Sequence, residues 1–501
     1  MRAGPIADSA GPEPLHPREI PVTSRSIDPF RELLTAQRWA DLETLARFGR
    51  STFAGRPIWC VNSTANGGGV AEMLSTTLSY IRGAGLNARW AVMSGDAEFF
   101  SVTKRIHNFI HGSAGDGGSL GPSARDTYDR VCAQNLAGLL DLIEPGSMVI
   151  LHDPQTAGFV APLQRHGCQV VWRCHIGAAL HNECSSAAWS LLEPYVGGAD
   201  RLIFSRLNYV PDMFANVPIA IVAPSIDPFA PKNLNLDDRS VREILLAAGL
   251  VSGVSVGLSP AFHRLDGRRA EVRHRAELLD GGLPPDLDRP IVLQVSRWDR
   301  LKDHLGVMKG FISSLGSIDA DLMLAGPNTV ADDPEGTEVL GELLSEHAGL
   351  PESVRRRVHI ASLPTVDIDE NAVMVNALQR HATIVVQKSL QEGFGLTVTE
   401  AMWKGKPVIA SGVGGITDQV SDGHTGVLLK DPDDLDAFGT AVVALLDAPD
   451  RAADLGAAGK ANVTDHFLHD RHLRQYFETL GSLQAEASGR PDVGLPESVR
   501  N

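Results

Sequence analysis

The sequence predicts an α/β protein built from two doubly wound domains in series. Short apolar runs alternate with amphipathic helical stretches over about residues 52–235, and the same alternation restarts at Ile291. Strand–helix–strand repeats require crossover connections, which produce a mostly parallel sheet with helices on both faces. A length of 501 residues accommodates two such domains, at roughly 150 residues for each domain and the remainder for other segments.

Ten apolar runs are expected as strands: Pro57–Asn62, Ala88–Met93, Met148–His152, Gln169–His175, Arg201–Phe204, Ile291–Val295, Leu322–Ala325, Val358–Ile360, Thr383–Gln387 and Val408–Ala410. Helical spacing is expected over Asp28–Arg50, between the strands, after Ala437 and over Asp470–Ser482. The predicted organisation is a disordered arm (1–26), an N-terminal domain with a leading helix (27–235), a linker (236–289), a C-terminal domain (290–465), a closing helix (466–486) and a disordered tail (487–501).

The charge balance and the cysteine count exclude several classes of protein. Lys and Arg total 45 against 61 Asp and Glu, a net charge of −16, which argues against nucleic acid as a partner. No apolar run reaches the roughly 18 residues that span a bilayer, and we expect no membrane partner. Five cysteines, an odd number, do not form a disulfide framework. Together with the lack of a secretory signal pattern, this predicts a cytoplasmic protein.

Ligands of open α/β sheets bind at the carboxyl ends of the strands, so two such domains predict a site in the cleft between them. A glycine-rich turn over 62–72 (NSTANGGGVAE) follows one expected strand and includes Asn66, Gly67, Gly68 and Gly69. Its backbone can approach an anion or a sugar hydroxyl closely. It matches neither the dinucleotide-binding nor the Walker pattern, and a tight turn without a ligand is the alternative.

Two histidines end neighbouring strands in the sequences HDPQ (152–155) and WRCHIG (172–177). Strand ends on neighbouring strands point to the same edge, so His152, Asp153 and His175 are expected there. For His175 we predict a role at a sugar hydroxyl or at the reacting centre, whereas His152 can also be a buried histidine bonded to backbone. A metal site formed by Cys174, His175, His181 and Cys184 is disfavoured, because their spacing fits no zinc pattern.

Basic and acidic residues follow two strands of the C-terminal half. Arg297 and Lys302 lie in SRWDRLK (296–302), five positions apart, and can converge on a diphosphate, although solvated surface cations are the alternative. The second stretch runs from Glu392 to Glu400 and includes Gly393, Phe394, Gly395, Leu396 and Thr397. A helix is predicted to begin near Leu396, with its amides directed at phosphate oxygens. Glu392 lies in the loop, and Glu400 is placed to accept hydrogen bonds from ribose hydroxyls.

This stretch resembles the E-x7-E signature of retaining glycosyltransferases of family 4 in the GT-B group, which have two facing Rossmann-like domains. Val413–Ile416 (VGGI) follows the next strand, as that group expects. More narrowly, the stretches NSTANGGGVAEML, ARWAVMSGDAEFFSVTKRIHN, HDPQ, WRCHIG, QVSRWDRLKD and EGFGLTVTEAMWKGKPVIASGVGG are similar to trehalose synthases of the glucosyl-transferring type. The resemblance covers about residues 30–480, without the proline-rich start and the extended segment around 250–288.

The resemblance implies an enzyme that joins a nucleoside-diphosphate glucose to glucose, with the N-terminal domain on the acceptor side. Arg297 and Lys302 would hold the donor diphosphate, and Glu400 would bind the ribose. Glu392 would contact the transferred sugar near its 3- and 4-hydroxyls, beside the backbone of Gly393–Leu396. His175 would lie by the same sugar, and Gly67–Gly69 would approach the phosphates or the sugar.

We expect catalysis by a direct same-face displacement in which a phosphate oxygen takes the proton of the acceptor. The acidic triplets at 286–288, 367–369 and 434–436 resemble metal-binding DxD, but acidic turns explain them as well, and no metal or other cofactor is expected. The expected donor substrate is ADP-, UDP- or GDP-glucose. The alternatives are a trehalose phosphorylase, a transferase with another acceptor, and a non-catalytic sugar-nucleotide binding module. Whether the chain forms a homodimer stays open.

Overall fold

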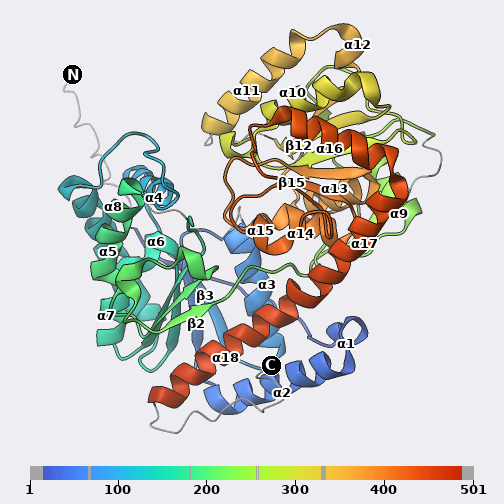
Figure 1. Cartoon of the computed structure of the whole chain (residues 1–501). Helices are drawn as coiled ribbons and strands as arrows, with labels where there is room; N and C mark the ends of the chain where they lie inside the picture. The colour runs from blue at the N-terminus through green and yellow to red at the C-terminus, as the bar shows by residue number, and fades with distance from the viewer. Residues whose placement is uncertain are drawn as a thin grey trace, which may run out of the picture. The chain divides into compact units, whose positions relative to one another are not determined.

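The computed structural model describes residues 15–65, 69–179, 182–254, 257, 259–328 and 334–487. It forms two compact units, Met1–Ala223 with His472–Asn501 and Pro224–Arg471 (Figure 1). Each unit holds a seven-stranded sheet, and we describe each unit by itself. Among the described residues, no helix combines the length and the apolar composition needed to cross a membrane.

The sheet of the first unit has the strand order β1-β3-β2-β4-β5-β6-β7. All neighbours pair in parallel except β1 with β3. The strands are β1 (Arg18–Ile20), β2 (Ile58–Asn62), β3 (Ala88–Val92), β4 (Met148–His152), β5 (Gln169–Cys174), β6 (Arg201–Phe204) and β7 (Ile219–Ile221). Strands β2 and β4 are buried along their whole length, as expected of a parallel sheet covered on both faces.

The helices of this unit are α1 (Phe30–Leu33), α2 (Ala36–Phe53), α3 (Gly69–Gly83), α4 (Ala97–Ile110), α5 (Pro122–Leu142), α6 (Asp153–Thr156), α7 (Val160–Arg165), α8 (Glu183–Val196) and most of α18 (His469–Ala487). An aromatic cluster joins the sheet to α8. Trp189 packs against Trp172 of β5 and Phe204 of β6, with ring centroids 6.5 and 6.1 Å apart. This packing fixes strands β5 and β6 against α8, and so it also fixes the positions of the residues at their carboxyl ends.

The sheet of the second unit has the order β10-β13-β12-β11-β14-β15-β16, parallel except for β10. The strands are β10 (Glu277–Leu278), β11 (Ile291–Val295), β12 (Asp321–Pro327), β13 (Val358–Leu363), β14 (Ile384–Gln387), β15 (Val408–Ser411) and β16 (Val427–Leu429). The helices are α9 (Asp238–Ala248), α10 (His304–Ser314), α11 (Pro334–Ala348), α12 (Glu352–Arg355), α13 (Ile368–His381), α14 (Leu396–Trp403), α15 (Ile416–Gln419), α16 (Leu435–Asp447) and α17 (Pro449–His466). Two doubly wound sheets are therefore present, as predicted.

Two segments near the N-terminus differ from the prediction. The part of the expected arm that the structure describes, 15–26, is not disordered: β1 pairs with β3, and Glu19 forms an ion pair with Arg89 at 2.7 Å. The expected helix over Asp28–Arg50 is two helices, α1 and α2, separated at Leu34. The Thr35 side chain starts the second helix by accepting a hydrogen bond from the backbone N–H of Arg38 at 3.3 Å. Residues 1–14 and 488–501 lie outside the described part.

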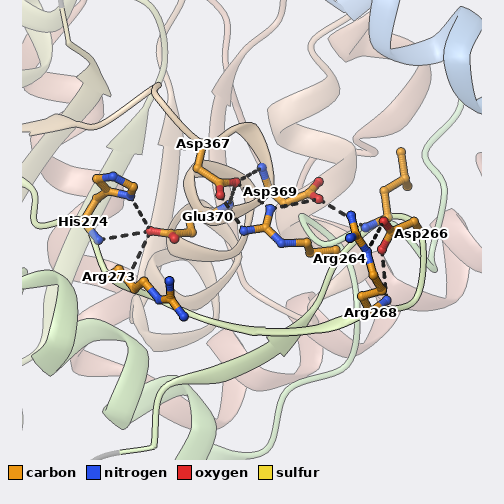
Figure 2. Close-up of polar contacts among 9 residues, drawn as sticks. Arg264, Asp266, Arg268, Arg273, His274, Asp367, Asp369 and Glu370 are labelled. Carbon is orange, nitrogen blue, oxygen red and sulfur yellow. Dashed lines mark hydrogen bonds and ion pairs between the residues drawn. The ribbon is translucent and has the colours of Figure 1, made fainter.

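The segment expected as a linker, 236–289, is built into the second unit. Helix α9 lies over 238–248, β10 extends the sheet, and β8 (Ala261–His263) pairs with β9 (Arg269–Glu271) in a hairpin. Figure 2 shows how the hairpin is anchored to the start of α13. Arg264 donates two hydrogen bonds to Asp367, at 2.9 and 2.5 Å. The first unit also ends at Ala223, earlier than the predicted 235. Strands β8, β9 and β10 are short and have few buried residues, so they carry no apolar run that composition could reveal.

Candidate functional site

The loops that follow β11 and β14 bring together a cation and a carboxylate that the sequence singled out. Strands β11 and β14 are parallel neighbours, so both loops leave the same edge of the sheet. The backbone N–H of Leu390 donates to the carbonyl of Leu301 at 2.8 Å and joins the loops. Lys302 Nζ lies 2.6 Å from Glu392 Oε2, and Ser389 Oγ donates to the same oxygen at 3.4 Å. An ammonium group and a carboxylate thus share one partly buried position at the carboxyl edge.

Arg297 has a different partner. Its Nη2 lies 3.1 Å from Asp299 Oδ2, and its side chain is 64% exposed, whereas that of Lys302 is 17% exposed. Asp299 also accepts a hydrogen bond from the backbone N–H of Leu301 at 2.8 Å, which shapes the turn between the two basic residues. Arg297 and Lys302 therefore flank one loop, each with its own carboxylate.

A glycine turn leads from this pair into α14, which begins at Leu396 as predicted. Gly395 has φ +87°, a left-handed conformation that glycine adopts without strain. Gly415 N donates to the carbonyl of Gly393 at 3.0 Å, and a Cβ at Gly415 would lie 2.7 Å from Phe394 Cα. The turn is thus pressed against the loop after β15. The first amides of α14, including those of Leu396 and Thr397, lack partners within the helix and are suited to anionic oxygens.

Glu400 lies further along α14 and is buried. Its Oε1 lies 3.4 Å from Lys232 Nζ. Lys404, one turn later and also buried, donates to the carbonyl of Glu400 at 3.1 Å and to Gln379 Oε1 at 2.8 Å. Burial lowers the pKa of Lys404 to about 7, an effect that the Glu400 carboxylate opposes. Sequence reasoning missed both lysines: Lys404 is four positions from Glu400 and could have been found, whereas nothing marks Lys232.

Sequence reasoning also missed Lys388, which is fully buried after β14. Its Nζ forms an ion pair with Asp303 and also donates to the carbonyl of Pro432. Asp303 has φ +51° and starts α10 by accepting a hydrogen bond from Gly306 N at 3.0 Å. Because Asp303 directly follows Lys302, this ion pair holds the loop that presents Lys302.

In the first unit, the two predicted histidines meet at the ends of β4 and β5. His152 Nδ1 lies 2.9 Å from His175 Nε2, and the two ring planes are inclined by 16°. The predicted proximity of these residues is confirmed. Burial lowers the pKa of each imidazole well below its ordinary value, and the positive charge of Arg173 lowers both further. The pair is therefore uncharged at neutral pH.

Asp153 supports this pair from an unusual backbone conformation, with φ +65°. Its Oδ1 accepts a hydrogen bond from the backbone N–H of His175 at 2.8 Å, and its carbonyl accepts one from Trp172 Nε1 at 3.1 Å. Burial raises the pKa of Asp153 to about 7, which the hydrogen bond from His175 and the charge of Arg173 oppose. Arg173, fully buried, is held by the hydroxyl of Tyr476.

The glycine-rich turn is described only at its ends. Asn62 accepts a hydrogen bond from Trp90 Nε1 at 2.8 Å and donates to the carbonyl of Thr64 at 2.6 Å, and Gly69 begins α3. Asn66, Gly67 and Gly68 lie outside the described residues, as does His181 of the disfavoured metal set.

The acidic triplets have local partners. Asp367 accepts hydrogen bonds from the amides of Asp369 and Glu370 at the start of α13, and Asp434 does the same for Ala437 in α16. Asp286 accepts one from the amide of Asp288 at 2.9 Å. These contacts are those of helix caps and acidic turns.

Comparisons with known proteins identify the family of this chain. Residues 60–211 match a family model described as trehalose synthase, N-terminal domain, and 279–462 match glycosyl transferases group 1. A trehalose synthase of Pyrococcus horikoshii is 31% identical, over 93% of this chain and 98% of that protein. One of Rubrobacter xylanophilus is 32% identical, over 90% and 95%. A trehalose phosphorylase of Pleurotus sajor-caju is 25% identical, over 73% of this chain and 50% of that protein.

Solved structures support the fold. A trehalose-6-phosphate structure from E. coli, bound with UDP-2-fluoro glucose, has a TM-score of 0.63 at 13% identity, over 85% of this chain and 99% of the other. A UDP-forming trehalose-phosphate synthase of Burkholderia xenovorans in complex with glucose-6-phosphate has 0.63 at 15%, over 86% and 100%. These structures have the GT-B fold, and the expected fold is confirmed. The chain belongs to the trehalose synthase family and is a hexosyltransferase.

Proposed function

We propose that this chain moves glucose from a nucleoside-diphosphate glucose to free glucose and forms trehalose with the anomeric configuration retained. One observation carries the proposal: Lys302 Nζ and Glu392 Oε2 lie 2.6 Å apart at the carboxyl edge of the second sheet. An ammonium group there can neutralise a diphosphate oxygen, and the carboxylate can accept hydrogen bonds from sugar hydroxyls. Membership of the trehalose synthase family supports this choice of substrates.

The second unit is proposed to bind the donor. Lys302 and Arg297 hold the diphosphate, assisted by the turn at 393–397 and the first amides of α14. Glu392 contacts the transferred glucose, and Glu400 accepts hydrogen bonds from the ribose. Glu400 is buried beside Lys232, and that cation favours the ionised carboxylate that this role requires.

The first unit is proposed to bind sugar. His175 contacts the transferred glucose, and Asp153 with Asn66 holds sugar hydroxyls. Gly67–Gly69 approach the phosphates or the sugar through their backbone. The described contacts of His175 and Asp153, which order the ends of β4 and β5, support this part of the proposal.

The chemistry proposed for the site is a direct displacement on one face of the sugar. The bond from the anomeric carbon to the diphosphate oxygen breaks while the acceptor hydroxyl bonds to the same face. A leaving phosphate oxygen takes the hydroxyl proton, so no protein nucleophile is needed. Lys302 and Arg297 stabilise the developing phosphate charge, and we propose that these two cations do so without a metal ion.

Phosphorolysis of trehalose is the second candidate, favoured by the 25% identity to the trehalose phosphorylase of Pleurotus sajor-caju. In that reaction inorganic phosphate takes the place of the nucleotide. The proposed contact of Glu400 with the ribose has no counterpart in phosphorolysis, where the donor carries no ribose, so we keep nucleotide-sugar transfer as the first candidate. A transferase with a different acceptor sugar would keep the donor site unchanged.

The test is nucleoside-diphosphate release from ADP-, UDP- and GDP-glucose in EDTA, with and without glucose, followed by identification of the sugar formed. Glucose-dependent release with a non-reducing disaccharide is the expected result, and it would also name the donor. If nucleoside-diphosphate release required a sugar other than glucose, that sugar would replace glucose as the acceptor in the proposal. Turnover of trehalose with inorganic phosphate, and none with nucleotide sugars, would replace the proposal with phosphorolysis. Tight donor binding without turnover would identify a binding module.

A further inference from the structure

We propose that His152 is a positioning residue that holds His175 in the tautomer with its proton on Nδ1. His175 then offers a hydrogen-bond donor, not an acceptor, to the transferred sugar. The role toward the sugar rests on the proposed function. The tautomer follows from the contacts of the two imidazoles alone, so the two parts can be tested separately.

The imidazole rings of His152 and His175 share one proton. His152 Nδ1 and His175 Nε2 lie 2.9 Å apart, a hydrogen-bond distance for two ring nitrogens. One nitrogen must donate and the other must accept. Both imidazoles are uncharged at neutral pH, because burial and the charge of Arg173 disfavour protonation of either. Each ring therefore carries a single N–H, and two arrangements are open.

The other nitrogen of His152, Nε2, distinguishes the two arrangements. This atom, Nε2, is buried and has no hydrogen-bond partner among the described residues, and the whole side chain is 1% exposed. If His175 donated, the proton of His152 would lie on Nε2 as a buried N–H without an acceptor, which is rare in proteins. If His152 donates from Nδ1, Nε2 keeps only a lone pair.

The bond to His152 also determines which nitrogen of His175 carries the proton. When His175 Nε2 accepts the bond from His152, the single proton of His175 lies on Nδ1. The ring cannot turn over without breaking this bond, and its backbone N–H is bonded to Asp153 Oδ1 at 2.8 Å. His175 therefore presents a fixed N–H donor. A donor selects an oxygen lone pair on the sugar, and its direction limits which hydroxyl can meet it.

The tautomer can be read directly by long-range ¹H–¹⁵N correlation spectra of the full chain labelled with ¹⁵N-histidine, at pH 7.5 and without ligand. The His175 signals are assigned by their loss in His175→Gln. We expect a protonated Nδ1 and a bare Nε2. A proton on Nε2, or a doubly protonated ring, would overturn the inference.

Two variants separate positioning from simple structural support. His152→Leu removes the donor, and we expect His175 to move toward the Nε2–H tautomer that free imidazole side chains prefer. We also expect kcat/KM for the donor to fall about tenfold, the effect of one hydrogen bond. His152→Asn places an amide N–H near the former Nδ1, so the original tautomer and kcat/KM within about threefold are expected.

Circular dichroism and thermal unfolding check that both variants fold. Equal losses of activity in the two variants, with the tautomer unchanged in both, would show a structural role and overturn the proposal. If the wild-type chain transferred no glucose at all, the proposed function would fail, and the spectra would still decide the tautomer.

Discussion

Lys302 Nζ lies 2.6 Å from Glu392 Oε2, although the two residues are 90 positions apart in the chain. Both side chains are largely buried, with 17% and 12% exposed. A pair of this kind loses hydration on both ions and is stabilised by their mutual attraction and by further hydrogen bonds, here from Ser389. Removing one partner leaves the other charge poorly compensated, so each residue positions the other.

Lys302→Met should lower kcat/KM for the donor by about 100-fold to 1,000-fold, the usual effect of deleting one charge that stabilises a leaving group. Steady-state kinetics with the donor identified above measures it. Lys309→Met is the matched control, because Lys309 of α10 is half exposed and its carboxylate partner, Glu346, is 4.0 Å away. The control should keep kcat/KM within about twofold. Unchanged kinetics in Lys302→Met would remove this residue from the donor site.

Arg297→Ala should weaken donor binding strongly without lowering stability. The side chain is 64% exposed, and its ion pair with Asp299 contributes little to folding. Arg300→Ala is the control in the same loop, since Arg300 pairs with Glu338 and Glu342 on α11. Isothermal calorimetry should show the loss of donor affinity in the first variant alone. Equal affinity in both variants would show that Arg297 does not hold the diphosphate.

The central strands could be predicted from the sequence, whereas the edge strands could not. Buried parallel strands are continuous apolar runs, and the observed bounds of Met148–His152 match the predicted ones. Strand β7 lies in the apolar stretch 217–223 and was missed. Strand β1, at the opposite sheet edge, has few buried residues, so its composition resembles that of a loop. The same reason explains why the hairpin and β10, within the segment expected as a linker, were not predicted.

The sequence predicted those features of the candidate site that depend on strand order alone. Neighbouring strand ends predicted that His152 and His175 lie together, and the structure places their ring nitrogens in contact. The Lys302–Glu392 ion pair could not be predicted. Strand order places both loops at the carboxyl ends of neighbouring strands, but it does not determine how the side chains are oriented. Lys388, one position after a buried strand, shows the same limit: its pairing with Asp303 depends on how α10 begins.

Asp153→Asn should change the pH dependence of stability in the first unit. Burial raises the pKa of Asp153 from 3.8 to about 7, so the folded state binds its proton more tightly than the unfolded state. This contribution to stability is complete below about pH 4 and is lost as the pH rises to about 7, by at most about 1.4 kcal/mol per pH unit. Asparagine tolerates the left-handed backbone at φ +65°.

Urea unfolding of the wild-type chain and of Asp153→Asn, from pH 4 to about pH 9.5, measures this contribution. The difference between the two transition midpoints should change in favour of the variant between pH 4 and pH 7 and stay level above pH 8. Asp153→Ala is the control for backbone strain, since alanine loses the side-chain acceptor and fits the left-handed region poorly. A constant difference between wild type and Asp153→Asn would contradict the raised pKa.

Glu370→Leu should release the hairpin from the start of α13. Glu370 Oε2 accepts hydrogen bonds from the backbone N–H groups of Arg273 and His274 at 3.1 Å and contacts His274 Nδ1 at 2.8 Å (Figure 2). Its side chain is 3% exposed, so the variant leaves two backbone donors without their acceptor. The expected cost is about 2–4 kcal/mol of local stability. Hydrogen exchange of the amides over 261–274 should speed up accordingly.

The control is Glu352→Leu, because Glu352 is exposed on α12 and, among the described residues, pairs across one helical turn with Arg356. Exchange over 261–274 should be unchanged in this control. Arg264→Met tests the second anchor, because the hydrogen bonds of Arg264 to Asp367 are half-buried and charge-assisted. We expect this variant to speed up hydrogen exchange over 264–268 more than at the amides of Arg273 and His274. If Glu370→Leu left exchange over 261–274 at the wild-type rate, Glu370 would not anchor the hairpin.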